Sequence, residues 1–289
     1  MHWGRPEPAW VGERFVAMRE RGGGRFGLHR GTGRGFRAAV EEFARHRDPR
    51  RSGNPDRAGN GAAMRIAPIG TALSHLDDGD FARAVAGVSI LTHREPRAVA
   101  AALAVARSGS LLFSAGASAD RAEILEDLAR WTAARETELG AGYGLVPEGR
   151  RVSDVLRSAL GAWAEGLEAQ LGRVADLAGE DLGRPALPSD GYALASPVAA
   201  ILIALRATSF EDAVVRAVNL GGDADTVGAM VGGLAGAAWG LDAIPDRWRR
   251  IPGYEEVLAL ARYLAGYPYE GPLPDLMDLE ERLSARLAR

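Results

Sequence analysis

Apolar residues recur along most of the chain at the three- and four-residue spacing of an amphipathic helix, whereas the alternation typical of strands is rare. In 119–139 and in 154–171 the apolar positions fall on one helical face, so each range is predicted to be a helix. Range 97–107 is rich in alanine and apolar nearly all round, which predicts a buried helix. The same pattern predicts helices at 209–220, 254–264 and 278–287.

Local start signals support two of these helices. Ser196 and Pro197 have the order of an N-cap followed by a proline in the first helical turn. Ser209 is a second N-cap candidate, with Glu211 and Asp212 directly after it. We find no repeat of fixed period and no long linker, and 47% hydrophobic content in 289 residues is ample for a large core. The sequence therefore predicts one all-α domain over residues 1–289.

Composition narrows the chemistry. The absence of cysteine excludes disulfides, zinc–thiolate sites and thiol nucleophiles, and the absence of lysine excludes Schiff-base chemistry. Every run of eighteen residues is interrupted by a charged residue or a glycine, so no transmembrane helix is expected. The N-terminus lacks the apolar core of a signal peptide. We therefore expect a cytoplasmic protein that does not insert in membranes.

Charge is unevenly distributed. Residues 1–65 carry 14 arginines against 7 acidic residues, although the whole chain has a formal charge of −3. Such a basic segment can bind nucleic acid. No aromatic residues interleave these arginines as a single-strand platform would need, and there is no helix-turn-helix or zinc pattern. A nucleic-acid partner is therefore the least favoured hypothesis, and a solvated surface is the simpler one.

The strongest chemical signal lies just before a predicted helix. Gly221 and Gly222 precede Asp223, Asp225 and Thr226, which bring two carboxylates and a hydroxyl within four residues. Oxygen groups of this kind are the ligands that Mg²⁺ and Mn²⁺ prefer, and glycines let the backbone turn sharply and approach a ligand. The alternative is that the aspartates cap the free N–H groups of the helix. We expect both aspartates to lie in a non-helical turn, aimed at one point.

The longer string around this motif resembles a family signature. Residues 219–228 and 232–237 resemble the C-terminal motif of the ADP-ribosylglycohydrolase family. Residues 59–68 resemble that family's glycine–asparagine loop, which lies along bound ADP-ribose, and residues 91–93 resemble its threonine–histidine element. The resemblance covers most of residues 10–250. It implies an orthogonal all-α bundle that hydrolyses an N- or O-glycosidic bond at the ribose with two Mg²⁺ or Mn²⁺ ions.

The resemblance also implies residue roles. Asp223, Asp225 and Thr226 would be the metal ligands, and an ADP-ribosylated protein or a small ADP-ribose conjugate would be the substrate. The implied substrate-binding residues are Asn60, Gly61, Met64, His93 and Gly222. On chemical grounds alone, Asn60 offers both a donor and an acceptor, whereas a lone histidine such as His93 is as readily structural as substrate-facing.

The chain departs from the family pattern at its start. The family's glycine–aspartate element and its threonine–aspartate–aspartate–threonine motif supply the other half of the metal site, and neither occurs here. We therefore expect the chain to be N-terminally incomplete relative to the family, with its catalytic acids unidentified and with apolar surface exposed near Trp10, Phe15 and Phe81. Two functions stay open: a hydrolase, or a catalytically impaired relative that binds ADP-ribose or a partner without turnover.

Overall fold

The chain folds almost entirely into helices. The computed structural model describes residues 6–21, 26 and 32–287, and across these residues it contains no strand, only isolated bridges between Asn54 and His93 and between Gly59 and Tyr192. The all-α prediction is therefore confirmed. The α-helices are α1 (Pro8–Glu20), α2 (Arg34–His46), α3 (Pro49–Ser52), α4 (Ala67–Ala72), α5 (Asp78–Ile90), α6 (Pro96–Ala115), α7 (Arg121–Tyr143), α8 (Val152–Gly161), α9 (Leu167–Leu182), α10 (Ser196–Arg206), α11 (Phe210–Val218), α12 (Ala224–Trp239), α13 (Tyr254–Leu264) and α14 (Leu276–Leu287).

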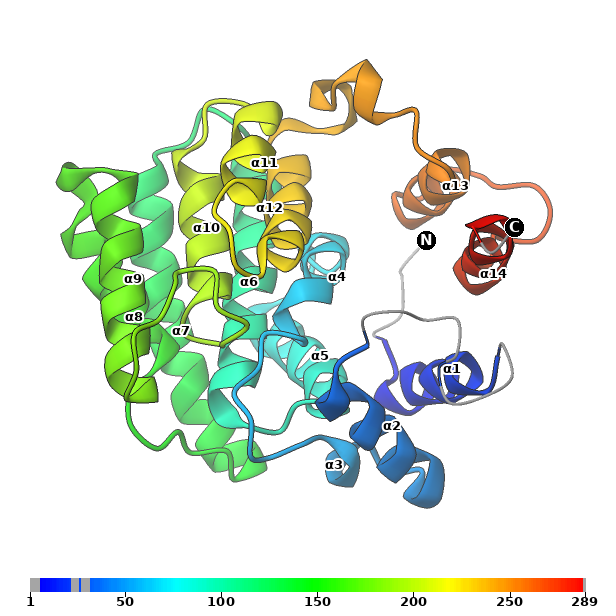
Figure 1. Cartoon of the computed structure of the whole chain (residues 1–289), viewed down its shortest axis with the longest axis horizontal. Coiled ribbons are helices and arrows are strands. Elements are labelled where there is room, and N and C mark those ends of the chain that lie inside the picture. The colour runs from blue at the N-terminus through cyan, green and yellow to red at the C-terminus, as the bar shows by residue number, and fades with distance from the viewer. Residues whose placement is uncertain (1–5, 22–25, 27–31, 288–289) are drawn as a thin grey trace.

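Helix α6 is the centre of the main core. Helices α4, α5, α7, α10 and α12 surround it, while α1, α2, α13 and α14 lie on the other side of the molecule (Figure 1). Residues 98–106 of α6 are all buried, as their apolar composition predicts. Helix α6 is long and apolar enough to cross a membrane by length and composition, yet 72% of its apolar window is buried inside this fold. Packing within the protein accounts for its hydropathy.

Glycines allow α4 to lie directly against its neighbours. A Cβ on Gly70 would lie 2.2 Å from the carbonyl oxygen of Ala106 in α6, and a Cβ on Gly233 of α12 would lie 2.8 Å from the Cβ of Ala67. Only glycine permits backbones to approach this closely. Helix α4 follows the 59–65 loop in the chain, so this tight packing holds that loop on a rigid base.

Several predicted elements are confirmed and one is wrong. Helices α6, α13 and α14 cover their predicted ranges, and α7 and α11 match theirs to within two residues at each predicted end that they fall short of. Ser209 does cap α11 by accepting a hydrogen bond from the Asp212 N–H. Range 154–171 is not one helix, because α8 ends at Gly161 and α9 begins at Leu167. Gly166 between them has φ +97°, a conformation that favours glycine and interrupts the helix. The break lets α9 fold back along α8.

Two further expectations are corrected at the level of single residues. Ser196 is the first residue of α10 rather than its N-cap, a position that Ala195 occupies. Phe81 is buried, with its ring centroid 6.0 Å from that of Trp131 in α7, because α5 packs against α6. Trp10 is 65% exposed, as expected.

A small second core joins α1 and α2. It contains Val16, Phe26, Val40, Phe43 and Leu91 and has Phe15, Met18 and Phe36 packed at its edge. The rings of Phe15 and Phe36 meet edge to face with centroids 5.0 Å apart. This cluster fixes one aromatic wall opposite the 59–65 loop.

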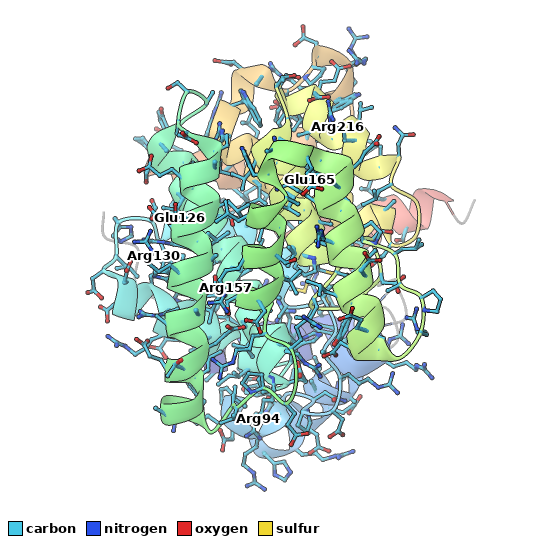
Figure 2. The ribbon with its side chains drawn as sticks, turned by 90° about the vertical axis from the view of Figure 1, so that its left-hand side faces the viewer. Arg94, Glu126, Arg130, Arg157, Glu165 and Arg216 are labelled. Atoms are coloured by element: carbon cyan, nitrogen blue, oxygen red, sulfur yellow. The ribbon has the colours of Figure 1, made fainter. Side chains whose placement is uncertain are left out.

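A buried carboxylate joins α7 to α8. Glu136 accepts hydrogen bonds from the Val152 N–H at 2.8 Å and from the Ser153 hydroxyl at 2.6 Å. We expect Glu136→Ala to lower the free energy of unfolding by roughly 3 kcal/mol, since each unsatisfied buried polar group costs about 1–3 kcal/mol. Urea denaturation measures this loss. The control is Glu126→Ala, an exposed site on the same helix (Figure 2), and equal losses in both variants would contradict the assignment.

Candidate functional site

A pocket of about 540 Å³ lies between the 59–65 loop, the start of α12 and the α1–α2 wall. Six of the predicted site residues line it together, although they come from three separate parts of the chain. They are Asn60, Gly61, Met64, His93, Asp223 and Thr226. Gly222 and Asp225, the other two predicted residues, are not in its lining.

Asp223 and Asn60 join the two motifs directly. The Asn60 side-chain amide donates to Asp223 Oδ2 at 2.6 Å and to the Ser196 hydroxyl at 2.9 Å. Asp223 occupies the N-cap position of α12, yet its side chain forms no capping hydrogen bond. Its backbone N–H instead donates to the Ser189 carbonyl at 3.3 Å. The carboxylate is therefore directed at the pocket side of the helix start rather than used as a cap.

Asp225 and Thr226 lie in the first turn of α12, which begins at Ala224. The expectation that both aspartates lie in a non-helical turn is therefore wrong for Asp225, which is exposed. Within the described part of the chain, no side chain forms an ion pair with Asp223 or Asp225, and no hydrogen bond occupies the Thr226 hydroxyl. These oxygens remain available, and their hard-donor chemistry fits a divalent cation such as Mg²⁺ or Mn²⁺. No group of three or more His, Asp or Glu side chains gathers around them in residues 6–21, 26 and 32–287.

The glycines before Asp223 shape the backbone instead of lining the pocket. Gly221 and Gly222 have φ values of +76° and +62°, in the left-handed region. A Cβ on Gly222 would lie 2.4 Å from the hydroxyl oxygen of Ser189, whereas one on Gly221 would meet nothing within 4 Å. Gly222 therefore lets the turn rest on Ser189, which places Asp223 beside Asn60.

Thr92 and Arg65 hold the His93 imidazole in the pocket wall. Arg65 donates to the Thr92 hydroxyl oxygen at 2.7 Å and to the Gly61 carbonyl at 2.7 Å. The Thr92 hydroxyl also lies 2.8 Å from His93 Nδ1. The hydroxyl oxygen has two lone pairs, so it can accept from Arg65 and either donate to Nδ1 or accept from it. Burial, and then the charge of Arg65, lower the pKa of His93 to about 4.

This depressed pKa makes a prediction for pH dependence. The unfolded chain binds a proton on His93 below about pH 6.5, while the folded protein does so only near pH 4. The contribution of His93 to stability is therefore present above pH 6.5 and is lost as the pH falls toward 4. We expect the stability difference between wild type and His93→Asn to shrink over this interval in urea titrations. His75→Asn, at an exposed site, is the control, and a difference that stays constant with pH would refute the buried neutral imidazole.

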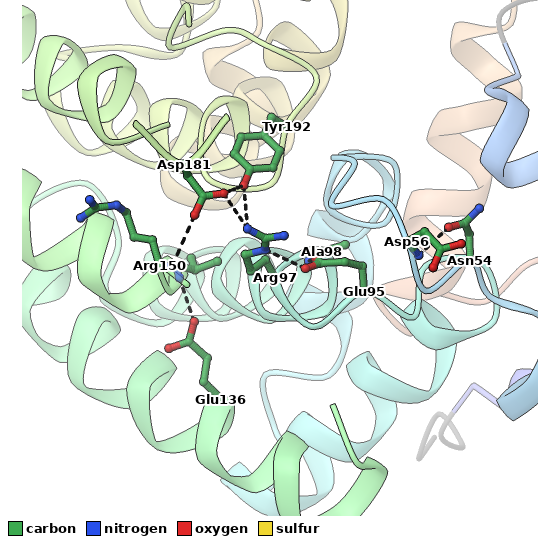
Figure 3. Close-up of polar contacts among 10 residues, drawn as sticks. Asn54, Asp56, Glu95, Arg97, Ala98, Glu136, Arg150, Asp181 and Tyr192 are labelled. Atoms are coloured by element: carbon green, nitrogen blue, oxygen red, sulfur yellow. Dashed lines mark hydrogen bonds and ion pairs between the residues drawn. The ribbon is translucent and has the colours of Figure 1, made fainter. Parts of the chain in front are cut away.

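A buried polar network supports the far side of the site. Arg97 donates to Asp181 at 2.6 Å and to the Tyr192 hydroxyl at 2.9 Å, and the Tyr192 hydroxyl donates to Asp181 (Figure 3). Burial and the hydrogen bond to Asp181 raise the pKa of Tyr192. Gly191, next to Tyr192, would place a Cβ 3.3 Å from Asp223 Oδ2. The network thus anchors the segment that backs the Asp223 carboxylate.

Comparison with known proteins identifies the family. A model of the family described as ADP-ribosylglycohydrolase matches residues 2–272. The chain belongs to the ADP-ribosylglycohydrolase family. A solved structure titled "ADP-ribosylglycohydrolase-related protein complex" superposes with a TM-score of 0.60 at 30% identity, covering 89% of this chain and 73% of that one. The resemblance inferred from the motifs, and the all-α architecture implied by it, are therefore confirmed.

Three curated relatives of this family member are described as hydrolases or glycohydrolases of ADP-ribosyl groups. The bovine ADP-ribosylhydrolase ARH3 is 30% identical over 260 residues, which covers 80% of this chain and 67% of the relative. The ADP-ribosylarginine hydrolase Tri1 of Pseudomonas putida is 26% identical over 212 residues, covering 73% of this chain and 47% of the relative. The ADP-ribosyl-[dinitrogen reductase] glycohydrolase of Rhodospirillum rubrum is 52% identical over 40 residues.

Sequence reasoning missed the residues that support the site of this glycohydrolase-family chain. Arg65 follows the Gly59–Gly61 loop at helical spacing, and its local pattern gives no sign that it bonds to both Gly61 and Thr92. Arg97 and Asp181 are 84 residues apart, and no local signal connects them. Ser189 shows its role only through contact with Gly222.

Proposed function

We propose that this chain is a metal-dependent hydrolase that cleaves the glycosidic bond of ADP-ribosylated protein side chains or of related ADP-ribose conjugates. One observation carries the proposal most directly: the Asn60–Asp223 hydrogen bond of 2.6 Å joins the two family motifs at the wall of one pocket. A pocket of about 540 Å³ falls within the usual range of roughly 300–1,000 Å³ for small-molecule sites.

Asn60 and the oxygen ligands at the start of α12 then each have a role. Asp223 and Thr226 would hold Mg²⁺ or Mn²⁺ from the pocket wall, with Asp225 beside them in the first turn of α12. When bound, such an ion orients hydroxyl ligands and lowers the pKa of a coordinated water. Asn60 fixes the orientation of the Asp223 carboxylate.

The loop and His93 would face the ligand itself. A Cβ on Gly61 would lie 2.8 Å from the His93 ring. The absence of a side chain at Gly61 therefore lets the loop backbone and the imidazole approach one another closely. His93 lines the pocket as a ring whose pKa burial lowers to about 4, so it is uncharged from pH 5 to 8. An uncharged imidazole can form a hydrogen bond with a hydroxyl group of ADP-ribose.

A second candidate, ADP-ribose binding without turnover, has its own support. Among the described residues, Asp223 is the one carboxylate in the pocket lining, and a cation held by one carboxylate and one hydroxyl would be weakly bound. The two functions share the same ligand and differ in whether a bond is broken.

One experiment separates them. ADP-ribosylarginine and ADP-ribosylserine peptides are incubated with the protein in Mg²⁺, in Mn²⁺ or in EDTA, and released ADP-ribose is quantified. Calorimetric titration with ADP-ribose runs in parallel. A hydrolase releases ADP-ribose only with metal, whereas the second candidate binds ADP-ribose and releases none. If the protein neither binds ADP-ribose nor releases it from the peptides, both candidate functions are overturned.

A further inference from the structure

A second, separate hollow lies between α3, α5, α6 and the C-terminal end of α7. Two adjoining cavities of about 360 and 180 Å³ share the same three residues, Arg50, Gly142 and Tyr143. Their combined size is within the range of small-ligand sites. None of their lining residues lines the 540 Å³ pocket, so the hollow is distinct from the site that carries the proposed function.

Arginines surround this hollow. Four of them line it, against a single lining carboxylate, that of Glu138. They are Arg50, Arg83, Arg94 and Arg135. Figure 2 shows Arg94 at the lower edge of the molecule, below Glu126 and Arg130 of α7. Asp80 is already engaged by Arg83, and Asp78 pairs with Arg107 at 3.1 Å, so the nearby acidic residues of α5 have partners of their own.

Two of the four guanidinium groups lack an anionic partner. Among the ion pairs of the described residues, none involves Arg50 or Arg94. Arg135 does pair with Glu138 at 2.6 Å and lies 5.4 Å from the Trp131 ring centroid, yet its Nε is buried and has no hydrogen-bond partner. The Arg135 side chain is only 15% exposed, so this unused donor is desolvated. A buried donor without an acceptor is costly unless something supplies one.

The floor of the hollow is apolar. Leu103 and Leu139 line the larger cavity, Ile90 and Leu145 line the smaller one, and the ring of Tyr143 is shared by both. A hollow lined by arginine guanidinium groups and by apolar side chains suits an anion that carries a small organic group. The planar arginine fork matches phosphate oxygens in pairs, which makes phosphate the anion of choice.

We propose that the hollow lined by Arg50, Arg94, Arg135 and Tyr143 is a second ligand site, which binds a small phosphate-bearing molecule. The phosphate lies between Arg50 and Arg94, which line the smaller cavity together, and the organic group lies against Tyr143 and extends toward Arg135 in the larger cavity. The site is independent of metal and of the proposed hydrolysis.

Calorimetric titration tests this with pyrophosphate and AMP as the probes. The full chain is titrated without ADP-ribose, because the phosphates of ADP-ribose would compete for the same hollow, and sodium chloride at matched ionic strength is the blank. We expect saturable binding of one probe molecule, weakened at least about tenfold in Arg50→Ala/Arg94→Ala, since a hydrogen bond to a charged group is worth about 1.5–3 kcal/mol. Arg130→Ala, an exposed arginine on the same helix as Arg135, should bind as the wild type does.

The outcomes are distinct from those of the proposed function. If ADP-ribose does not bind at all, the proposed function fails while the probe titration still stands. Tighter binding of AMP than of pyrophosphate supports a contact with the organic group, and equal binding supports recognition of the phosphate alone. Heat that the sodium chloride blank reproduces, or binding that the double variant retains, overturns the proposal. Should the double variant fail to fold, Arg50→Ala alone serves, because Arg50 is exposed in the four-residue helix α3.

Discussion

Asp223→Ala is expected to lower the release of ADP-ribose more than about 100-fold, since even residues one shell behind a metal ligand are worth about 10–100-fold. The substitution removes the one carboxylate in the pocket lining and leaves the Asn60 amide without its 2.6 Å acceptor. Stability should change little, because the Asp223 side chain caps no N–H group of α12. Steady-state release from ADP-ribosylated peptides in Mn²⁺, together with the melting temperature, measures both effects.

Variants at other residues show whether the loss of turnover is specific to Asp223. Asp242→Ala, at an exposed aspartate after α12, should keep wild-type turnover. Asn60→Ala should lose about 10–100-fold, as a residue that orients a ligand does. Asp225→Ala tests the neighbouring carboxylate separately, and a loss comparable to that of Asp223→Ala would place it in the ligand set. Wild-type turnover in Asp223→Ala would show that the metal motif is misassigned.

Gly222→Ala is expected to be the most damaging single-methyl change near the site. The left-handed φ of +62° costs about 1–2 kcal/mol for a residue with a Cβ, and the methyl would lie 2.4 Å from the Ser189 hydroxyl oxygen. Overpacking adds about 1–3 kcal/mol, so the total loss of stability is roughly 2–5 kcal/mol. Asp223 follows directly, so its alignment with Asn60 should suffer as well. Urea denaturation and ADP-ribose titration report the two effects.

Gly221→Ala separates strain from clash. Its φ of +76° carries the same backbone penalty, but its Cβ would meet nothing within 4 Å. We therefore expect only about 1–2 kcal/mol of loss there. The double variant Gly222→Ala/Ser189→Gly should recover the difference between the two single variants, because it removes the atom that the methyl would strike. Equal losses at Gly221 and Gly222, with no recovery in the double variant, would exclude the contact with Ser189.

Local sequence was a good guide to helices with their own start and stop signals. Ser209 caps α11, and range 97–107 is a buried helix, because capping and apolar composition are local properties. The break at Gly166 was not predicted, since Leu167 and Leu171 continue the apolar spacing of α8. Only the left-handed backbone of Gly166 reveals it.

In the candidate site, too, some residues can be predicted from local sequence and others cannot. The residue types and the motif resemblance predict that Asn60, His93 and Asp223 belong to one site. Their support could not be predicted, because Asn60 and Asp223 are 163 residues apart and Arg97 meets Asp181 across 84 residues. Contacts of that range depend on how α6, α9 and α12 pack. The placement of Asp225 likewise depends on α12 beginning at Ala224, before Asp225 rather than after it.

The most direct test of the central claim is a crystal structure of the protein soaked with ADP-ribose and Mn²⁺, with anomalous diffraction collected to locate the metal. The account predicts ADP-ribose density along Asn60, Gly61 and His93, and an anomalous peak beside Asp223 and Thr226. ADP-ribose bound elsewhere, or bound in this pocket with the metal far from Asp223, would contradict it.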